Sequence, residues 1–162
     1  MTERHLISQK MREHYETVWR AGDAWNFEVS EFEQARYAHQ LDFLGEQRYE
    51  RALEIGCGSG CFTRRLAGIA DRVVALDIAE VAIKRARMQV AGAGPGVVEF
   101  RVADAMHYDL HAEGPWDLVV VSETMYCLGW LYPFFDIAWF ACKLLNATRA
   151  GGRLLLTNTY GQ

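Results

Sequence analysis

The sequence lacks any long hydrophobic run. No apolar stretch of the 162-residue chain approaches the ~20 residues that a membrane-spanning helix requires, and no apolar segment follows the charges of the N-terminal MTERHLISQK. A membrane span and a secretory signal are therefore not expected. With 51% hydrophobic and 23% charged residues, the composition is typical of one globular domain, which we expect in the cytoplasm.

Cysteine is scarce, and its spacing does not fit a metal site. The chain has four cysteines, Cys57, Cys61, Cys127 and Cys142. The first two flank glycines of one loop. They do not have the spacing of a zinc knuckle, in which two residues separate the cysteines, and no histidine follows them at ligand spacing. Disulfides are not expected without secretion. We predict free thiols and no metal site.

The chain also lacks a basic surface. Residues 1–50 hold 6 basic and 10 acidic residues, which accounts for the whole formal net charge of −4. The one short basic run, Lys84, Arg85 and Arg87, is expected on the solvated face of a helix. Nucleic-acid binding usually needs a basic face that replaces phosphate counterions, so we expect no nucleic-acid partner.

From residue 51 onward, short apolar runs alternate with helical stretches, the pattern of βαβ units and a parallel sheet. The runs are β-branched or leucine-rich and are bounded by turn residues. Strands are predicted over residues 51–55, 72–76, 97–102, 117–121 and 153–157. Helices are predicted over about 59–68, from Ala79 onward, and between Pro133 and Arg149. The predicted fold class is therefore α/β, with one Rossmann-like sheet.

The N-terminal segment precedes this pattern. We predict an N-terminal helical cap or lid over residues 1–45 and the sheet domain over residues 46–162. Ser30 and Glu33 have the spacing of a capping box at the start of the second helix, and Gly45 ends it. The first helix is indicated by its own hydrophobic period.

Aromatic residues gather in two segments. The irregular linker 22–29 carries Trp25 and Phe27, and exposed rings there suggest a lid over a ligand. The helix predicted between Pro133 and Arg149 is also aromatic, and we expect it to pack on the sheet and against the N-terminal segment or another subunit. Its aromatic residues are Phe134, Phe135, Trp139 and Phe140.

The strongest signal is ALEIGCGSGCF at residues 52–62, a strand followed by Gly56, Gly58 and Gly60 and then a helix. Glycines let the backbone turn tightly and leave room for a ligand, and the helix start offers free N–H groups. The next predicted strand ends in Asp77. A carboxylate at that position can accept both hydroxyl protons of a ribose, which indicates an adenosine-type ligand. A helix N-cap is the other interpretation of Asp77.

The glycine spacing separates two classes of ligand. It is Gly-x-Gly-x-Gly with Glu54 two residues ahead, and not the Gly-x-Gly-x-x-Gly that lays a pyrophosphate on a helix. Together with LDI at 76–78, AD at 103–104 and DLVVVSE at 117–123, the motif EIGCGSG resembles the class I S-adenosylmethionine (SAM) dependent methyltransferases. The resemblance implies strand order 3-2-1-4-5 and S-adenosyl-L-methionine as cofactor.

Within that superfamily, the chain is similar to the rhizobial nodulation N-methyltransferase (NodS-like) family, which acts on the amino sugar of lipochitooligosaccharide precursors. The similarity lies in DAW at 23–25, FEQAR at 32–36 and SETMYCL at 122–128. Tyr37 and Cys127 depart from it, where histidine and tyrosine are expected. The resemblance implies methyl transfer to a small-molecule acceptor, an amine nitrogen such as that of an amino sugar in a chitooligosaccharide-like substrate.

The resemblance also implies cofactor contacts. Asp77 would hold the ribose, Ile78 would pack on the adenine, and Asp104 would accept the adenine amino group, with a backbone N–H from one of the next two residues. Ser122 would offer its carbonyl to the methionine ammonium and Arg36 would pair with the methionine carboxylate, unless Arg36 is a solvated helix residue. The full predicted set is Trp25, Arg36, Glu54, Gly56, Gly58, Gly60, Asp77, Ile78, Asp104, Ala105, Met106 and Ser122.

Three residues are candidates for the chemistry. Methyl transfer is an in-line displacement, so the protein mainly orients the lone pair of the acceptor toward the methyl group and excludes water. An amine acceptor must lose one proton before attack, and a nearby carboxylate can take it. Glu123 follows the fourth predicted strand, at the carboxyl-end crevice. Tyr126 on the same loop could orient the acceptor and His107 could act as a base; packing or solvent-exposed roles are the alternatives for all three.

Other function classes share parts of this pattern. A NAD-dependent oxidoreductase would use Asp77, but it would need a substrate domain and the shifted glycine spacing. A non-catalytic SAM-fold partner protein would lose the glycines or the ribose carboxylate, and this chain keeps both. Among methyltransferases, O- or C-methylation of a small metabolite remains the alternative to an amine.

The predicted sheet ends in a bare edge. Class I methyltransferases add further strands, 6 and 7, after the fifth, and these are apparently absent because the chain stops at TNTYGQ. Residues 153–159 would then offer unpaired backbone groups. We expect either the N-terminal part of a longer polypeptide or, if the chain is complete, a homodimer through the fifth strand and the aromatic helix.

Overall fold

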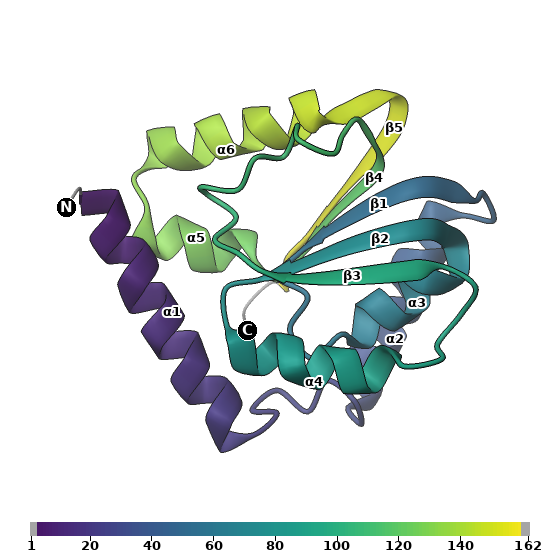
Figure 1. Ribbon diagram of the computed structural model, residues 1–162, viewed down its shortest axis with the longest axis horizontal. Coiled ribbons are helices and arrows are strands. Elements are labelled where there is room, and N and C mark those ends of the chain that lie inside the picture. Colours follow the sequence, from purple (N-terminus) through teal and green to yellow (C-terminus); the bar gives the residue numbers. More distant parts are fainter. Residues whose placement is uncertain (1–2, 160–162) are drawn as a thin grey trace.

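The computed structural model describes residues 3–159; the outer ends of both predicted domains, residues 1, 2 and 160–162, lie outside the described residues. Five parallel strands form one sheet in the order β3-β2-β1-β4-β5 (Figure 1). The strands are β1 Tyr49–Ile55, β2 Ala70–Asp77, β3 Val97–Val102, β4 Trp116–Ser122 and β5 Thr148–Thr157. The helices are α1 Glu3–Ala21, α2 Glu31–Leu44, α3 Cys61–Ile69, α4 Glu80–Val90, α5 Met125–Leu131 and α6 Phe134–Ala147. The predicted fold class and strand order are confirmed.

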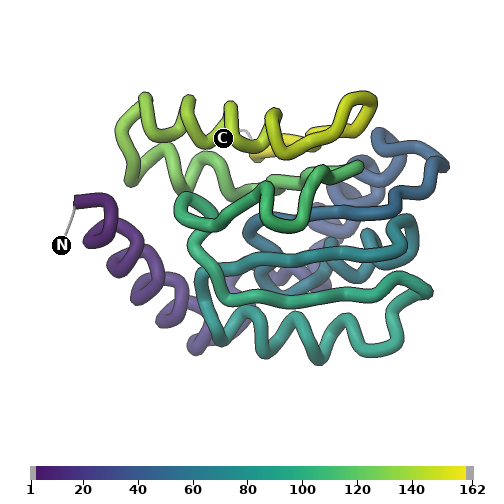
Figure 2. Tube along the Cα trace, turned by 45° about the horizontal axis from the view of Figure 1, so that its top comes forward, coloured from purple at the N-terminus to yellow at the C-terminus, as the bar shows by residue number. Residues whose placement is uncertain are grey.

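The central strands are buried on both faces. Successive residues of a strand point to opposite faces, so Leu53 and Val119 join the core under α5 and α6 while Ala52 and Leu118 join the core under α2 and α3. Such near-continuous apolar strands are typical of parallel sheets covered by helices on both sides. Figures 1 and 2 place α4 and α6 on opposite sides of the sheet.

The two N-terminal helices lie in different places. In Figures 1 and 2, α1 lies beyond the carboxyl ends of the strands and reaches from α6 to α4. Arg4 of α1 donates to Asp136 of α6 through Nε at 3.1 Å, and Trp19 packs with Ala79 and Ala82 beside α4. By contrast, α2 packs on one face of the sheet through Tyr37 and its neighbours. No helix of residues 3–159 is long and apolar enough to cross a membrane.

Two elements differ from the sequence-based prediction. Residues 125–131, expected as a loop, form helix α5, whose apolar residue Leu128 is buried in the core. Strand β5 begins at Thr148, five residues before the expected start, because a bulge between the Trp116 and Leu118 pairings takes up the extra length. Gly151, expected to end a helix, lies in this irregular stretch with φ 78°.

Helix α6 buries only one of its four aromatic side chains. Phe140 is fully buried, whereas Phe134, Phe135 and Trp139 are 78%, 81% and 54% exposed. The helix packs on the sheet as expected, with Phe140 in the core, but the other three rings stay exposed because α6 is an outer-layer helix and only one stripe of its surface faces the sheet. Strand β5 is an edge of the sheet within the described residues.

A pair of substitutions on α6 tests this orientation. We expect Phe140→Ala to lower the free energy of unfolding by about 3 to 5 kcal/mol, because it leaves a cavity in the core. The matched control, Phe135→Ala, is expected to change it by roughly 0.5 kcal/mol or less, because the ring is exposed. Urea denaturation measures both, and equal losses would contradict the assignment.

Candidate functional site

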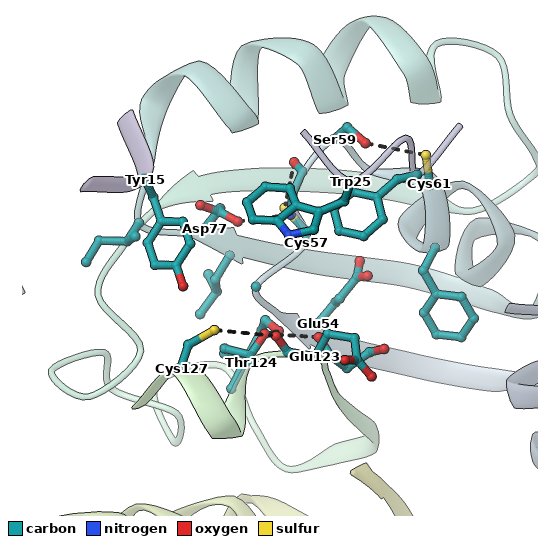
Figure 3. A pocket seen from close by; sticks show the side chains of 18 of the residues that line it. Tyr15, Trp25, Glu54, Cys57, Ser59, Cys61, Asp77, Glu123, Thr124 and Cys127 are labelled. Carbon is teal, nitrogen blue, oxygen red and sulfur yellow. Dashed lines mark hydrogen bonds between the residues drawn. The ribbon is translucent and has the colours of Figure 1, made fainter. Parts of the chain in front are cut away.

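A cavity of about 570 Å³ opens at the carboxyl ends of the strands. This is the usual ligand position in open α/β sheets. Residues from the ends of β1, β2 and β4 line it, together with residues of α1, the 22–30 linker, the start of α2 and α5. Figure 3 shows Asp77, Glu54 and Glu123 around the cavity, with Trp25 among them.

The loop after β1 approaches its neighbours closely. Gly56 and Gly58 line the cavity with positive φ angles of 77° and 53°. A Cβ on Gly56 would lie 2.0 Å from Oγ1 of Thr124, so only glycine fits there without displacing that side chain. Gly60 also has a positive φ, but it faces Ala86 of α4 and does not line the cavity. The structure therefore gives Gly60 a packing role between α3 and α4.

Asp77 braces the same loop. Its carboxylate accepts the N–H of Gly58 through Oδ2 and the N–H of Ala79 through Oδ1, each at 2.9 Å. Burial raises the pKa of Asp77 to about 6, although these backbone donors oppose the shift. The carboxylate keeps further acceptor capacity toward the cavity, since each oxygen has a second lone pair. Asp77 thus fixes the glycine loop through Gly58, bonds to Ala79 just before α4, and lines the cavity.

Glu54, at the end of β1, is a buried carboxyl group in the cavity wall. The hydroxyl of Thr63 donates to its Oε2 at 2.5 Å. Burial raises the pKa of Glu54 to about 8, and the nearby negative charge of Asp77 adds to the shift. The carboxyl group is therefore mostly neutral at pH 7.

A cluster of three charged residues forms another part of the wall. Arg36 of α2 pairs with Glu33 through Nη2, and its Nη1 lies 3.0 Å from Oε1 of Glu123. The other oxygen of Glu123 accepts the N–H of Thr159 at 2.9 Å. Glu123 has φ 54°, a left-handed conformation that is uncommon for a residue with a side chain. The structure thus joins Arg36 and Glu123, which the sequence analysis placed in separate roles.

Glu33 lines the cavity but is absent from the predicted catalytic and cofactor-binding residues. Ser30 Oγ accepts the N–H of Glu33 at 3.4 Å, but the Glu33 side chain pairs with Arg36 and does not return to Ser30. Only half of the predicted capping box forms. The i, i+3 spacing of Glu33 and Arg36 on a helix was the available signal.

Besides Gly60, three predicted residues lie outside the cavity lining. Asp104 accepts the N–H of Met106 at 2.9 Å and contacts Nδ1 of His107 at 3.0 Å, so its carboxylate orders its own turn. Met106 is buried in the core, and its N–H is engaged by Asp104. His107 is exposed. From this segment, Ala103 and Ala105 do line the cavity.

The other predicted residues lie around the cavity. Ser122 and Ile78 line it, as does Tyr126, which lies on α5 and not on a loop. Trp25 and Phe27 stack with ring centroids 5.4 Å apart, and both contact the buried Trp19 of α1. The ring of Trp19 lies against Gly58, since a Cβ there would be 3.0 Å from Cζ2.

Tyr15 of α1 and Cys127 of α5 are among the lining residues that were not predicted. Figure 3 shows their side chains pointing toward one another. Burial and the neighbouring Cys127 raise the pKa of Tyr15, so its phenol stays neutral at ordinary pH. The hydrophobic period of α1 gives no signal for this contact, because it depends on how α1 crosses the strand ends.

Comparison with known proteins identifies relatives. Residues 8–131 match the family model described as Nodulation protein S (NodS). Nodulation protein S of Rhizobium tropici is 32% identical over 150 residues, which cover 90% of this chain and 60% of that protein. The chain spans 49% to 60% of the length of the first three curated relatives it matches.

Solved structures show the same fold. N-methyltransferase NodS from Bradyrhizobium japonicum WM9, in complex with S-adenosyl-L-homocysteine, is similar with a TM-score of 0.77 and 24% identity, covering 88% of this chain and 70% of that one. The DhpI–SAM–HEP complex is similar with a TM-score of 0.69 and 27% identity, covering 92% and 63%.

The buried Glu54 predicts a pH dependence of stability. The pKa of Glu54 is about 8 in the folded chain, above its ordinary value of 4.5 in an unfolded chain. As pH rises toward 8, Glu54 therefore ionises first in the unfolded chain, and the free energy of unfolding falls. Asp77 titrates near pH 6, so Glu54 dominates between pH 6 and 8, with a slope of at most ~1.4 kcal/mol per pH unit. We expect Glu54→Gln to remove this slope.

Urea denaturation at pH 6, 7 and 8 measures the effect. The matched control is Glu50→Gln, on the exposed part of the same strand, which should keep the parent's slope. A parent whose free energy of unfolding does not fall between pH 6 and 8 would contradict the assignment.

Proposed function

The chain belongs to the nodulation protein S (NodS) family, and we propose that it is a SAM-dependent methyltransferase that acts on a small-molecule acceptor. The observation that carries the proposal is the glycine loop, which Asp77 braces beside a cavity of about 570 Å³ at the strand ends. Family membership supports the same conclusion.

The residues of the cavity fit S-adenosyl-L-methionine. Gly56 and Gly58 leave a cradle that any Cβ would narrow, and Asp77 keeps acceptor capacity for two ribose hydroxyls. Ile78 offers an apolar contact for adenine, and Ala105 is the nearby residue of the 104–106 turn that lines the cavity. The cofactor supplies a methyl group on a sulfonium, activated for in-line displacement.

The methionine end would lie near Ser122 and Glu54. The carbonyl of Ser122 accepts the hydroxyl of Thr124 at 3.0 Å and retains a second lone pair for an ammonium. Glu54 stays buried and mostly neutral until a cation approaches its carboxyl group. Asp104 and Met106 serve this site indirectly in the proposal, since their mutual hydrogen bond shapes the turn that carries Ala105.

We propose the N-terminal segment as the lid of this site. The stacked Trp25 and Phe27 line the cavity, and Trp19 of α1 holds them against the glycine loop. Aromatic rings at this position exclude water from a reaction that needs none.

The acceptor that we propose is an amine, such as that of an amino sugar. Tyr126 and Trp130 line the cavity and form an edge-to-face pair with centroids 5.5 Å apart. Trp130 is 82% exposed, and a broad ring that is open to solvent offers an apolar surface to a sugar ring. The similar solved structure of NodS from Bradyrhizobium japonicum WM9 is that of an N-methyltransferase, which supports a nitrogen atom as the acceptor.

Product analysis tests the function. The chain is incubated with SAM and either D-glucosamine or its β-1,4-linked dimer, and mass spectrometry is expected to show a gain of one methyl group on the amine. Glucose is the control, because a hydroxyl replaces the amino group. Methylation of glucose at the same rate would favour an O-methyltransferase, and binding of NADH without SAM would exclude this class of enzyme.

Asp77 provides a test of the cofactor site. We expect Asp77→Asn to weaken SAM binding by about 2 kcal/mol, roughly 30-fold, because it removes charge-assisted hydrogen bonds to the ribose. Asp71→Asn is the matched control, since Asp71 lies at the opposite end of β2 and pairs with Arg48 on the surface. Calorimetric titration measures the affinity of both variants for SAM. If the two variants bind SAM equally tightly, Asp77 does not bind the ribose.

A further inference from the structure

The cluster of Glu33, Arg36 and Glu123 carries two carboxylates for one guanidinium. All three side chains line the cavity and are only 11% to 15% exposed. When both acids are ionised, the cluster has one negative charge more than it can neutralise internally. An excess charge in a mostly apolar cavity is costly unless a ligand compensates for it.

We infer that Glu33 receives the ammonium group of the acceptor and takes its proton, while Arg36 is a positioning residue that holds Glu123 in place. This inference rests on the proposed function and names a different base from Glu123, the residue expected from the sequence.

The free oxygen atoms distinguish the two glutamates. Glu123 is held on both sides, by Arg36 at 3.0 Å from Oε1 and by the N–H of Thr159 at 2.9 Å from Oε2. Glu33 contacts Arg36 through Oε2 alone, and no hydrogen bond from residues 3–159 reaches its Oε1. Glu33 is a buried residue, and it lies in the cavity wall. It therefore offers the acceptor a partly unpaired carboxylate.

One further atom of the cluster lacks a partner. Nε of Arg36 is buried without a hydrogen bond within the described residues, whereas Oε1 of Glu123, which also has no well-oriented hydrogen bond, is contacted by Arg36 in the ion pair. Buried polar atoms are rarely left in this state. An acceptor with an amine and a neighbouring hydroxyl has both a donor and an acceptor group for such a cluster. This chemistry is that of an amino alcohol, which includes amino sugars.

The surroundings of Glu33 suit it to accept a proton. Burial raises its pKa, the charges of Glu123 and Asp23 raise it further, and Arg36 opposes them. A general base works best when its pKa is near the working pH. Arg36 pairs with both carboxylates of the cluster through its two terminal nitrogens.

The step balances in protons and electrons. The ammonium R–NH₃⁺ gives one proton to the carboxylate of Glu33 and becomes the amine R–NH₂. The lone pair of the nitrogen forms a bond to the methyl carbon as the S–C bond breaks, and the electrons of that bond remain on sulfur. The product is an N-methylammonium ion, and Glu33 returns its proton to solvent after release.

A set of matched variants tests the inference. Glu33→Gln keeps the size and removes the charge, and Glu31→Gln makes the same charge change on an exposed residue of the same helical turn. With D-glucosamine and saturating SAM, we expect Glu33→Gln to lower kcat/KM at least 100-fold. Its SAM affinity should stay within twofold of the parent. Glu31→Gln should retain the parent's activity, and Glu33→Asp should restore part of the loss.

The pH profile separates a base from a merely structural residue. Glu33→Gln should replace the acidic limb that Glu33 sets in kcat/KM with one at the pKa of the D-glucosamine ammonium, because only the free amine can then react. Glu123→Gln should move the limb set by Glu33 to lower pH, because it removes a like charge that raises the pKa of Glu33. Calorimetry of D-glucosamine with the chain bound to S-adenosylhomocysteine gives a second readout. There, Glu33→Gln should weaken binding at least 10-fold, with the melting temperature as the check on folding.

Three results would overturn the inference. They are equal losses in Glu33→Gln and Glu31→Gln, an acidic limb that stays at the parent's pH in Glu33→Gln, and a limb that Glu123→Gln does not move. The last result can be read even if Glu33→Gln is poorly folded, since it needs only the profiles of the parent and of Glu123→Gln. A parent that binds SAM but methylates neither D-glucosamine nor its dimer would instead overturn the proposed amine acceptor, and the inference with it.

Discussion

The close contact between the glycine loop and the end of β2 is the constraint on which the site depends. Gly56 and Cys57 both donate their N–H groups to the carbonyl of Leu76, and Gly58 donates to the side chain of Asp77. These bonds fix the loop against the neighbouring strand and leave its inner surface open. Because no Cβ fits at Gly56, the backbone itself becomes the wall of the cavity.

Three carboxyl groups line the cavity beside this wall, and burial raises the pKa of each. The pKa of Glu54 is raised to about 8, whereas that of Asp77 is raised only to about 6, because backbone N–H groups donate to its carboxylate. Glu33 lies beside Arg36, which opposes the effect of burial. Similar side chains thus acquire different protonation behaviour from their hydrogen-bond partners and not from their residue type.

Segments far apart in the chain complete the cavity. The N-terminal helix α1 crosses the strand ends and is tied at one end to α6 through Arg4 and at the other to α4 through Trp19. The backbone N–H of Thr159, just after β5, bonds to Glu123 after β4. The walls of the site therefore come from both ends of the described chain, while its floor comes from the first two βα turns.

The sequence by itself determined the α/β fold, the glycine loop and the placement of Asp77 at a strand end, because these depend on local periodicity and on backbone freedom that only glycine has. The strand order followed from the resemblance to class I methyltransferases. It did not determine that α5 is a helix, that Asp104 bonds within its own turn, or that Arg36 pairs with Glu33 and Glu123. Those features follow from how α2 and α5 pack around the sheet, which sets distances between residues that no sequence period relates. Side chains at a shared cavity respond to such neighbours, so their partners were decided only by the tertiary structure.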